Sequence, residues 1–316
     1  MAKHLLGIED LTKEELISYL DNAQGFVEVS ERDIKKVPSL RGKTIVNFFA
    51  EPSTRTRMSF EIAAKRLSAD ILNISTAESS VNKGETLLDT AQTIEAMAPD
   101  VLILRHRESG SARFLAKHLK KTSNVNAGDG THEHPTQTLL DCLTLRQQFG
   151  DRFNGKLTIA IVGDILHSRV ARSHLFAHRL LGNKIRLVGP HTLLPSFFTG
   201  ANGFDYKNVS CMHSLAQGLE GVDAVVALRM QLERQEAFFV PSLREYARNF
   251  CINEVAMNRY CPNAVLLHPG PVNRGIEVSG DVAYGPRSLV NKQVTNGVAV
   301  RMAVLFSLVS GAKEID

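Results

Sequence analysis

Cysteine is scarce in this chain, and its positions do not suggest a metal site. The four cysteines are widely spaced, with no Cys-x-x-Cys pair and no cysteine–histidine cluster at zinc-ligand intervals. A long chain that opens without a secretion signal favours reduced, packed thiols over disulfides. We therefore expect no metal and no disulfide framework; the cysteines are Cys142, Cys211, Cys251 and Cys261.

Long apolar runs are missing as well, and aromatic residues are few. No apolar run reaches membrane-spanning length, and the first ten residues do not read as a secretion signal, so we expect a cytoplasmic protein without a membrane partner.

The net charge of +4 and the pI near 8.9 are mildly basic, which leaves nucleic acid open as a partner. However, lysines and arginines are scattered and aromatics make up only 6% of the chain, so small anionic substrates explain the charge at least as well. We expect no nucleic-acid partner.

The dinucleotide-binding fingerprint Gly-x-Gly-x-x-Gly is also absent. In the turn after the apolar run 156–164, only Gly163 of that pattern is present. A nucleotide-binding interpretation therefore fails at this turn, and we expect no cofactor.

Alternating strand and helix patterns fill the first half of the chain. A length of 316 residues with 43% hydrophobic residues gives ample core for two domains. Thr12 and Glu15 form a capping box at the start of the first helical pattern. This alternation is typical of an α/β fold with a parallel sheet covered on both faces. We expect strands at 43–50, 70–75, 100–106 and 124–128, and helices at 12–29, 60–67, 86–97 and 111–119.

The second half repeats the scheme. We place the domain boundary within residues 145–155, which gives a first domain of residues 1–148 and a second of residues 149–290. A last helical pattern, 296–308, has no strand after it. The helix of the boundary covers 136–149, and the strands that follow it are expected at 156–164, 184–190, 223–229 and 264–269.

Residues suited to binding and catalysis come directly after these apolar runs. Ligands of parallel α/β sheets bind at the carboxyl ends of the strands, so this shared placement predicts one cleft between two such domains. The residues are Ser53 to Arg57, Arg105, His134, Arg169, Arg229 and Pro269 to Pro271.

The segment 51–61 reads as a phosphate-binding turn between a strand and a helix. The first N–H groups of a helix lack internal partners and the helix dipole is positive there, so an anion is stabilised. An ordinary N-cap with solvated arginines would explain a generic turn of this composition. The ordered string Ser-Thr-Arg-Thr-Arg is different, since it would occur by chance in about one in ten thousand chains of this length. Its hydroxyl and guanidinium donors are Ser53, Thr54, Arg55, Thr56 and Arg57.

This pentapeptide, after Phe-Phe and before Ser-Phe-Glu, resembles the carbamoyl-phosphate loop of the aspartate and ornithine carbamoyltransferases. The family's His-Pro-Thr-Gln also occurs, at 134–137; read alone, His134 could be a capping residue before a first-turn proline. The resemblance runs in order from about residue 40 to residue 300 and implies that the last helix, within 291–316, packs back on the first domain. It implies that carbamoyl phosphate is bound by Ser53, Thr54, Arg55, Thr56, Arg105, His134, Gln137, Pro269, Gly270 and Pro271.

Residues 229–231 distinguish the amino acceptor. Ornithine enzymes carry an acidic signature and Ser-Met-Gly here, whereas this chain has Arg229 and Gln231, and an arginine pairs with a carboxylate rather than an ammonium. Ornithine enzymes also place a cysteine in the segment that matches 268–275, where this chain has none. Some aspartate enzymes have Leu at the position of Gly270, so a side-chain contact there does not carry over to this chain. A contact through the backbone carbonyl is still expected. The resemblance therefore favours L-aspartate, held by Arg169, Arg229 and Gln231 together with Ser79 and Lys83.

The segment 79–90 resembles the family's swinging loop, whose Ser and Lys enter the active site of a neighbouring subunit. The matching residues are Ser79 and Lys83, and without the resemblance Lys83 reads as an ordinary solvated loop lysine. The resemblance implies a homotrimer with shared active sites and leaves open a larger assembly with regulatory or dihydroorotase-like chains.

The resemblance thus implies transfer of a carbamoyl group from carbamoyl phosphate to L-aspartate, a step of pyrimidine biosynthesis. The catalytic groups would be Arg55, Thr56, Arg105, His134 and Lys83. Two alternatives remain open: a carbamoyltransferase with another acceptor such as ornithine, and a non-catalytic anion-binding relative.

Overall fold

A computed structural model describes residues 3–75, 84–195, 208–231 and 239–311 of the 316-residue chain. The chain divides into two compact units. Unit 1 comprises Met1–Leu143 together with Thr295–Asp316, and unit 2 comprises Thr144–Val294. The two parallel sheets confirm the predicted fold class.

The sheet of unit 1 has four parallel strands in the order β2-β1-β3-β4. Phe49 at the end of β1 is paired with Arg105 at the end of β3, and His106 is paired with Asp129 at the end of β4. Three strand ends therefore lie side by side at one edge of the sheet. The strands are β1 (Thr44–Phe49), β2 (Asp70–Ser75), β3 (Val101–His106) and β4 (Ser123–Asp129).

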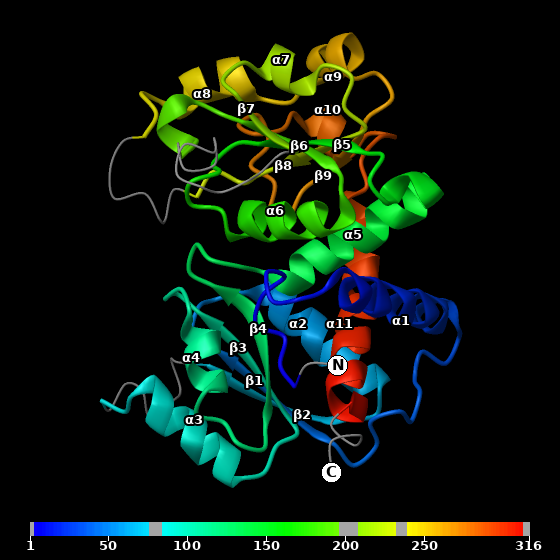
Figure 1. Cartoon of the computed structure of the whole chain (residues 1–316), viewed down its shortest axis with the longest axis vertical. Helices are drawn as coiled ribbons and strands as arrows, with labels where there is room; N and C mark the ends of the chain where they lie inside the picture. The colour runs from blue at the N-terminus through cyan, green and yellow to red at the C-terminus, as the bar shows by residue number, and fades with distance from the viewer. Residues whose placement is uncertain (1–2, 76–83, 196–207, 232–238, 312–316) are drawn as a thin grey trace. The chain divides into compact units, whose positions relative to one another are not determined.

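Helices cover both faces of this sheet. In Figure 1, α3 and α4 lie on one side of it, while α1, α2 and α11 lie on the other. On the α3 side, Phe48 and Leu104 of the strands are fully buried against Ile94 and Leu115 of the helices. Burying side chains of this size stabilises the fold by roughly 1.5–3 kcal/mol each. The helices are α1 (Lys13–Glu31), α2 (Thr54–Arg66), α3 (Leu87–Ala96) and α4 (Ser111–Ala116).

The last helix, α11 (Val290–Gly311), packs on helices of unit 1, as the family resemblance implies. Asn22 of α1 donates to the hydroxyl of Ser307 at 3.2 Å, and the rings of Phe26 and Phe306 meet edge to face at 5.8 Å. An 18-residue window of α11 has a mean hydropathy of 1.4, which is apolar enough for a membrane span. The expectation that no apolar run reaches that length is therefore wrong, but 67% of the window is buried within the protein, as in a core helix.

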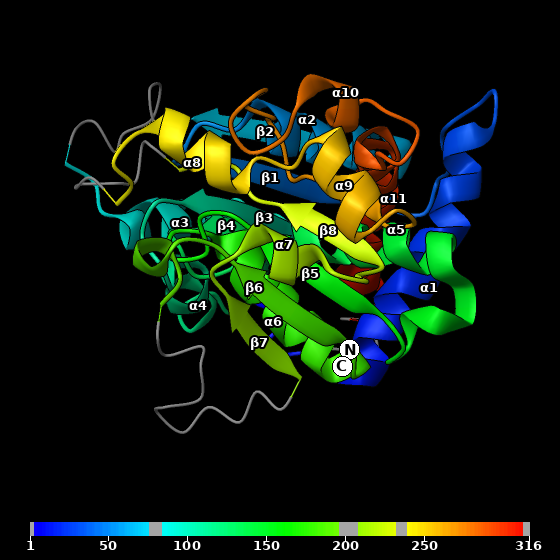
Figure 2. The same ribbon diagram turned by 90° about the horizontal axis from the view of Figure 1, so that it is seen from above.

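Unit 2 contains a five-stranded parallel sheet in the order β7-β6-β5-β8-β9, and Figure 2 shows its first four strands side by side. The edge strand β7 was not predicted, because four partly exposed residues are too few to show a period-two pattern. The sheet follows α5 (Pro135–Phe149) and the 3-10 turn η3 (Gly150–Phe153). The strands are β5 (Thr158–Val162), β6 (Lys184–Val188), β7 (Val209–Met212), β8 (Ala224–Ala227) and β9 (Val265–Leu267).

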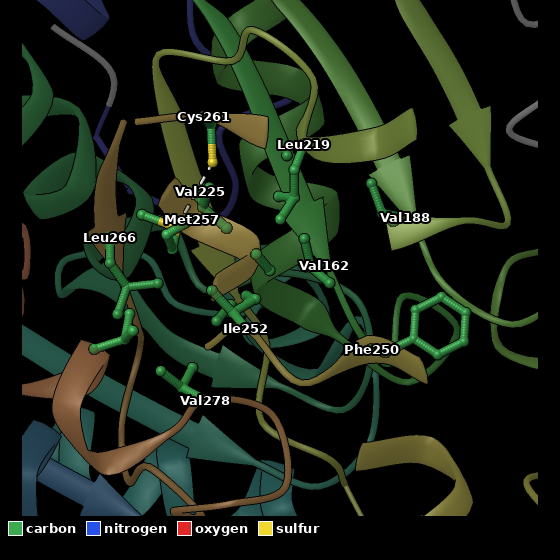
Figure 3. Packing of buried hydrophobic residues seen from close by; sticks show 14 of the residues in the cluster. Val162, Val188, Leu219, Val225, Phe250, Ile252, Met257, Cys261, Leu266 and Val278 are labelled. Carbon is green, nitrogen blue, oxygen red and sulfur yellow. Dashed lines mark hydrogen bonds between the residues drawn. The ribbon is translucent and has the colours of Figure 1, made fainter. Parts of the chain in front are cut away.

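Helices again cover both faces. In Figure 1, α6 lies on one face of the unit 2 sheet and α7, α8 and α9 on the other. Figure 3 shows the core of the second face, where Val162 and Leu266 of the strands pack near Ile252 and Met257. The helices are α6 (Arg169–Leu181), α7 (Leu215–Leu219), α8 (Leu243–Phe250), α9 (Glu254–Tyr260) and α10 (Gly280–Ala283), with a 3-10 turn η4 (His191–Leu193).

Candidate functional site

The first turn of α2 carries positive charge at the positive end of the helix. The helix begins at Thr54, earlier than the apolar periodicity from Phe60 indicates, so the Ser-Thr-Arg-Thr-Arg string forms the helix terminus itself. Ser53 is the extended N-cap residue, yet its side chain does not cap the helix, and the first turn contains no acidic residue. Arg55 and Arg57 therefore add to the positive dipole end, an unfavourable arrangement that a bound anion would reverse.

Arg105 lies beside this turn because β3 pairs with β1. The backbone N–H of Ala50 donates to the carbonyl of Arg105 at 2.8 Å. The guanidinium is largely buried; its Nη2 donates to Glu51 Oε1 at 2.6 Å and its Nη1 to the carbonyl of Ala127 at 3.4 Å. Thr56 is buried in the same first turn of α2. The structure thus brings the first turn of α2 and Arg105 together. It also shows that Glu51 pairs with Arg105, a contact that no sequence pattern indicated.

His134 and Gln137 stand at the start of α5. His134 directly precedes Pro135, the first residue of the helix, and both His134 and Gln137 are buried. Gln137 Nε2 donates to Asp141 Oδ1 at 3.1 Å one turn later, which fixes the amide. Asp141 is fully buried and was not singled out from the sequence.

Arg301 of α11 is a further buried cation near these residues. Its guanidinium lies over the ring of Phe60 of α2 at 5.1 Å, and its Nη1 donates to the carbonyl of Gly297 at 2.9 Å. Burial, together with the nearby charge of Arg105, lowers the pKa of Arg301 to about 9, and Asp141 opposes the shift. The last helix therefore contacts the helix whose first turn carries the Ser-Thr-Arg-Thr-Arg string.

The loop that leads to His134 is held by Asp129 and His132. Asp129 accepts from Asn126 Nδ2 at 2.7 Å and from the N–H of Gly110 at 2.6 Å, and it faces His132 Nδ1 at 3.1 Å. Burial opposes ionisation of Asp129, but the hydrogen bonds from His132, Asn126 and Gly110 outweigh it and lower its pKa. The bond to Asp129 raises the pKa of His132 to about 9 against the effect of burial, so this side chain is a cation at neutral pH.

The same loop is joined to the N-terminal segment. His132 Nε2 lies 3.2 Å from Glu9 Oε1, and Glu133 accepts from the N–H of Ile8 at 2.9 Å. Glu9, His132 and Glu133 are close enough to hold a metal ion. However, Arg113 also pairs with Glu9, and His132 is itself cationic, so protein cations already offset these carboxylates.

In unit 2, Arg169 is the first residue of α6 and is buried. The hydroxyl of Ser168 caps the helix by accepting from the N–H of Ala171 at 3.1 Å. Arg172 Nη2 donates to the carbonyl of Leu166 at 3.1 Å, which holds the backbone that leads into the helix. Arg169 is therefore held at a capped helix terminus, after the turn that follows β5.

Arg229 and Gln231 follow β8, the neighbour of β5. The fully buried Asp164 ties the two turns together, because its Oδ2 accepts from the N–H of Gln231 at 3.3 Å and its Oδ1 from His167 Nδ1 at 2.8 Å. Gln231 Nε2 donates to the carbonyl of Arg229 at 3.4 Å. The structure thus places both turns at adjacent strand ends and adds Asp164. The sequence does contain a signal for Asp164, because an acidic residue stands next to Gly163 just after β5. This signal was not used in predicting the site.

The turn 268–271 follows β9, the next strand of the sheet. The N–H of His268 donates to Gln293 Oε1 at 3.0 Å, and Gly270 has a φ of +69°, which favours glycine there. Pro269 and Gly270 are half-buried and Pro271 is exposed. Ser79 and Lys83 lie outside the described residues.

Comparisons with known proteins agree with this arrangement. Residues 3–147 match the carbamoyl-P binding domain of aspartate/ornithine carbamoyltransferases, and residues 155–308 match the Asp/Orn binding domain. The aspartate carbamoyltransferase catalytic subunit of Magnetococcus marinus is 51% identical over 314 residues, covering 98% of this chain and 94% of the relative. That of Geobacter sulfurreducens is 52% identical over 309 residues, covering 98% and 97%.

Solved structures give the same picture. Aspartate transcarbamoylase from Trypanosoma cruzi, in complex with N-(phosphonacetyl)-L-aspartic acid, is similar with a TM-score of 0.85 at 29% identity, covering 96% of this chain and 95% of that one. Ornithine carbamoyltransferase from Pyrococcus furiosus also gives 0.85, at 28% identity with 98% and 97% covered. The fold alone therefore does not separate the two acceptors.

Proposed function

Because this chain belongs to the aspartate/ornithine carbamoyltransferase family, we propose that it transfers the carbamoyl group of carbamoyl phosphate to L-aspartate. The products would be N-carbamoyl-L-aspartate and phosphate, in pyrimidine biosynthesis. Curated relatives that are 51–52% identical over nearly the whole chain are named aspartate carbamoyltransferase catalytic subunits.

The observation that supports this acceptor is the pair of turns after β5 and β8. Arg169 and Arg229 are cations at adjacent strand ends, and Asp164 accepts from the backbone of Gln231 to join the two turns. Two guanidinium groups suit a dicarboxylate amino acid, whereas they would repel the ammonium of an ornithine side chain. The structure of the Trypanosoma cruzi enzyme with carbamoyl phosphate and aspartate has a TM-score of 0.84 to this chain, which supports the same substrate pair.

Carbamoyl phosphate is proposed to bind at the strand ends of unit 1. Its phosphate would accept from the first N–H groups and hydroxyls of α2 and from Arg55 and Arg105, which reverses the unfavourable charge of that helix terminus. Gln137, held by Asp141, and the carbonyls of Pro269 and Gly270 would orient the carbamoyl NH2.

The chemistry is a direct displacement without a covalent enzyme intermediate. The aspartate nitrogen attacks the carbamoyl carbon, and the bond from that carbon to the bridging phosphate oxygen breaks with its electron pair on phosphate. Thr56, Arg105 and His134 are placed by α2, β3 and the start of α5, and they would stabilise the oxyanion that forms on the carbonyl oxygen. The departing phosphate is basic enough to take the amine proton.

We also propose a homotrimer in which Ser79 and Lys83 act in a neighbour's site. Three large apolar side chains, Met58, Ile62 and Leu72, are exposed on α2 and the edge strand β2. Asn73 donates to Glu61 at 3.2 Å, which places that part of β2 beside α2. Exposed apolar side chains on an edge strand and on the helix beside it suit contact with a second copy of the chain.

The self-association proposal is tested by solution mass. The double variant Met58→Glu, Leu72→Glu is expected to lower the mass of the trimer to that of a single chain. Val255→Glu, at an even more exposed apolar residue of unit 2, should leave the mass unchanged. A wild-type protein with the mass of one chain would contradict the proposal.

The activity is tested by incubating the purified chain with carbamoyl phosphate and one amino acid at a time. We expect N-carbamoyl-aspartate and phosphate with L-aspartate, and no product with L-ornithine. Turnover with ornithine would support the rival acceptor, and no turnover with either, in a sample of verified assembly, would support a non-catalytic relative.

A further inference from the structure

The turn that presents the carbonyls of Pro269 and Gly270 is held from inside by a histidine. His268 is only 2% exposed, and its Nδ1 lies 2.8 Å from the backbone nitrogen of Gly270. A backbone N–H can only donate, so Nδ1 must accept and carries no proton. The ring proton of this neutral imidazole therefore sits on Nε2.

Nε2 faces a buried carboxylate. It lies 3.3 Å from Glu277 Oε1, which also accepts from the N–H of Asn273 at 2.6 Å. Glu277 is 1% exposed, and its Oε2 is buried without a hydrogen-bond partner among the described residues. A buried carboxylate with one unpaired oxygen destabilises the fold, so its presence at Glu277 calls for an explanation. We explain it by the other oxygen, Oε1, which joins the ring of His268 to the backbone of Asn273.

Glu277 is itself anchored to the core of unit 2. The carbonyl of Glu277 accepts from the N–H of Ile252 at 2.9 Å, and the next residue, Val278, is fully buried in the cluster of Figure 3. From this anchor, bonds run through Oε1 to His268 and from His268 Nδ1 to Gly270. Gln293 holds the backbone N–H of His268. The turn is thus held through the backbone N–H groups of His268, Gly270 and Asn273, which leaves the carbonyls of Pro269 and Gly270 out of these bonds.

We propose that His268 and Glu277 are positioning residues that aim the carbonyls of Pro269 and Gly270 at the carbamoyl NH2. The inference rests on the proposed function. Because prolines at 269 and 271 have no N–H, and the N–H of Gly270 is used by His268, this turn presents acceptors and no donor. Such a surface selects an NH2 group over a group that cannot donate.

The consequence is a measurable preference. Acetyl phosphate has the shape of carbamoyl phosphate with a methyl group in place of NH2, so it cannot donate to the two carbonyls. Inorganic phosphate lacks the amide altogether. The dissociation constant of acetyl phosphate divided by that of carbamoyl phosphate therefore measures how well the turn accepts from the NH2 group. The dissociation constant of inorganic phosphate measures the remaining contacts to the anion.

Three substitutions of His268 and one of Glu277 test the proposal. His268→Ala and His268→Gln both remove the acceptor for the N–H of Gly270, and we expect the ratio to fall about tenfold. His268→Asn places an amide oxygen near the position of Nδ1 and should recover most of the preference. Glu277→Leu removes the anchor at similar volume and should resemble His268→Ala. Phosphate affinity should stay within about twofold of wild type throughout.

A matched control comes from another buried histidine of the same unit. His178 of α6 is fully buried and its Nδ1 lies 3.2 Å from Asn183, which precedes β6 at the opposite end of the strands. His178→Asn should lower thermal stability without changing the ratio.

The outcomes separate the inference from the function on which it rests. A wild-type preference for carbamoyl phosphate that all His268 and Glu277 variants retain would overturn the positioning role while leaving the activity in place. Equal loss of phosphate and carbamoyl phosphate affinity would also overturn it, since that pattern is general damage to the site. A wild-type protein without turnover would overturn the proposed function itself.

Discussion

Arg105 Nη2 donates to Glu51 Oε1 at 2.6 Å, so a cation proposed for phosphate is already paired with a carboxylate of the same unit. Both side chains are mostly shielded from water, at 11% and 22% exposure, which keeps solvent from screening the pair fully. A phosphate that reaches Arg105 must share it with Glu51 or displace it. We therefore expect Glu51 to lower the affinity of Arg105 for phosphate.

Neutralising Glu51 should tighten phosphate binding. In Glu51→Gln the competing charge is gone, and we expect the dissociation constant for inorganic phosphate to fall about two- to fivefold, as for loss of a partly exposed ion pair. Calorimetric titration measures it. Glu61→Gln is the matched control, because Glu61 pairs with Lys65 on α2 rather than with Arg105. An equal change in both variants would assign the effect to net charge and contradict the competition.

Removing Arg229 should affect aspartate far more than carbamoyl phosphate. A lost charge-assisted pair corresponds to about a 10- to 150-fold rise in the aspartate KM for Arg229→Ala, with the carbamoyl phosphate KM nearly unchanged. Arg229→Lys keeps the charge but loses the two-pronged geometry, so its aspartate KM should lie between those of wild type and Arg229→Ala. Steady-state titration of each substrate distinguishes these cases. Equal losses for both substrates would show that Arg229 does not bind aspartate.

Mixing two inactive variants should restore activity if sites are shared between chains. Lys83→Gln and Arg55→Ala each disable a different contribution to one site, so a hybrid oligomer contains some sites with neither substitution. We expect partial recovery, measured as product formation after the oligomers are dissociated and reassembled together. No recovery in hybrids whose composition is verified by mass spectrometry would rule out sharing.

The His132 contacts should stabilise unit 1 in a pH-dependent way. The folded pKa of His132 is raised to about 9 from 6.5 by Asp129, with Glu9 and Glu133 also facing the ring and Arg113 paired to Glu9. Stability from a raised pKa is fully present below pH 6.5 and is lost as the pH rises through 9. We expect His132→Gln to lose roughly 1–2 kcal/mol of unfolding free energy at pH 6 and almost none above pH 9.5.

Urea denaturation of wild type and variant at both pH values measures this difference. A loss of the same size at pH 6 and above pH 9.5 would mean that packing of the ring, and not its charge, supplies the stability.

Most strands could be predicted from local sequence patterns, because buried parallel strands are continuous apolar runs. The strands around Val46 and Ile159 were predicted for that reason. Strand β7 was missed because only four residues pair at a sheet edge. The start of α2 was placed too late, because Ser, Thr and Arg in its first turn carry no apolar period and the helix dipole opposes the arginines.

The sequence indicated the arginines near the strand ends more completely than the acidic residues beside them. Arg105 lies at the end of a strand, Arg169 comes after the turn that follows one, and both match family motifs, so their positions were visible in the sequence. Glu51, Asp164 and Glu277 act by accepting hydrogen bonds from partners that are brought near by the fold. A single acidic residue gives no periodic signal, so only the three-dimensional contacts show what each one holds.

Unit 1 is assembled from both ends of the polypeptide, since α11 supplies Ser307 and Phe306 to α1 and places Arg301 over Phe60. During synthesis, the surface that α1 and α2 offer to α11 stays uncovered until the residues of α11 have left the ribosome. A stop codon before α11 would therefore damage the first half of the protein, whose own residues are all intact, by leaving this apolar surface exposed to aggregation.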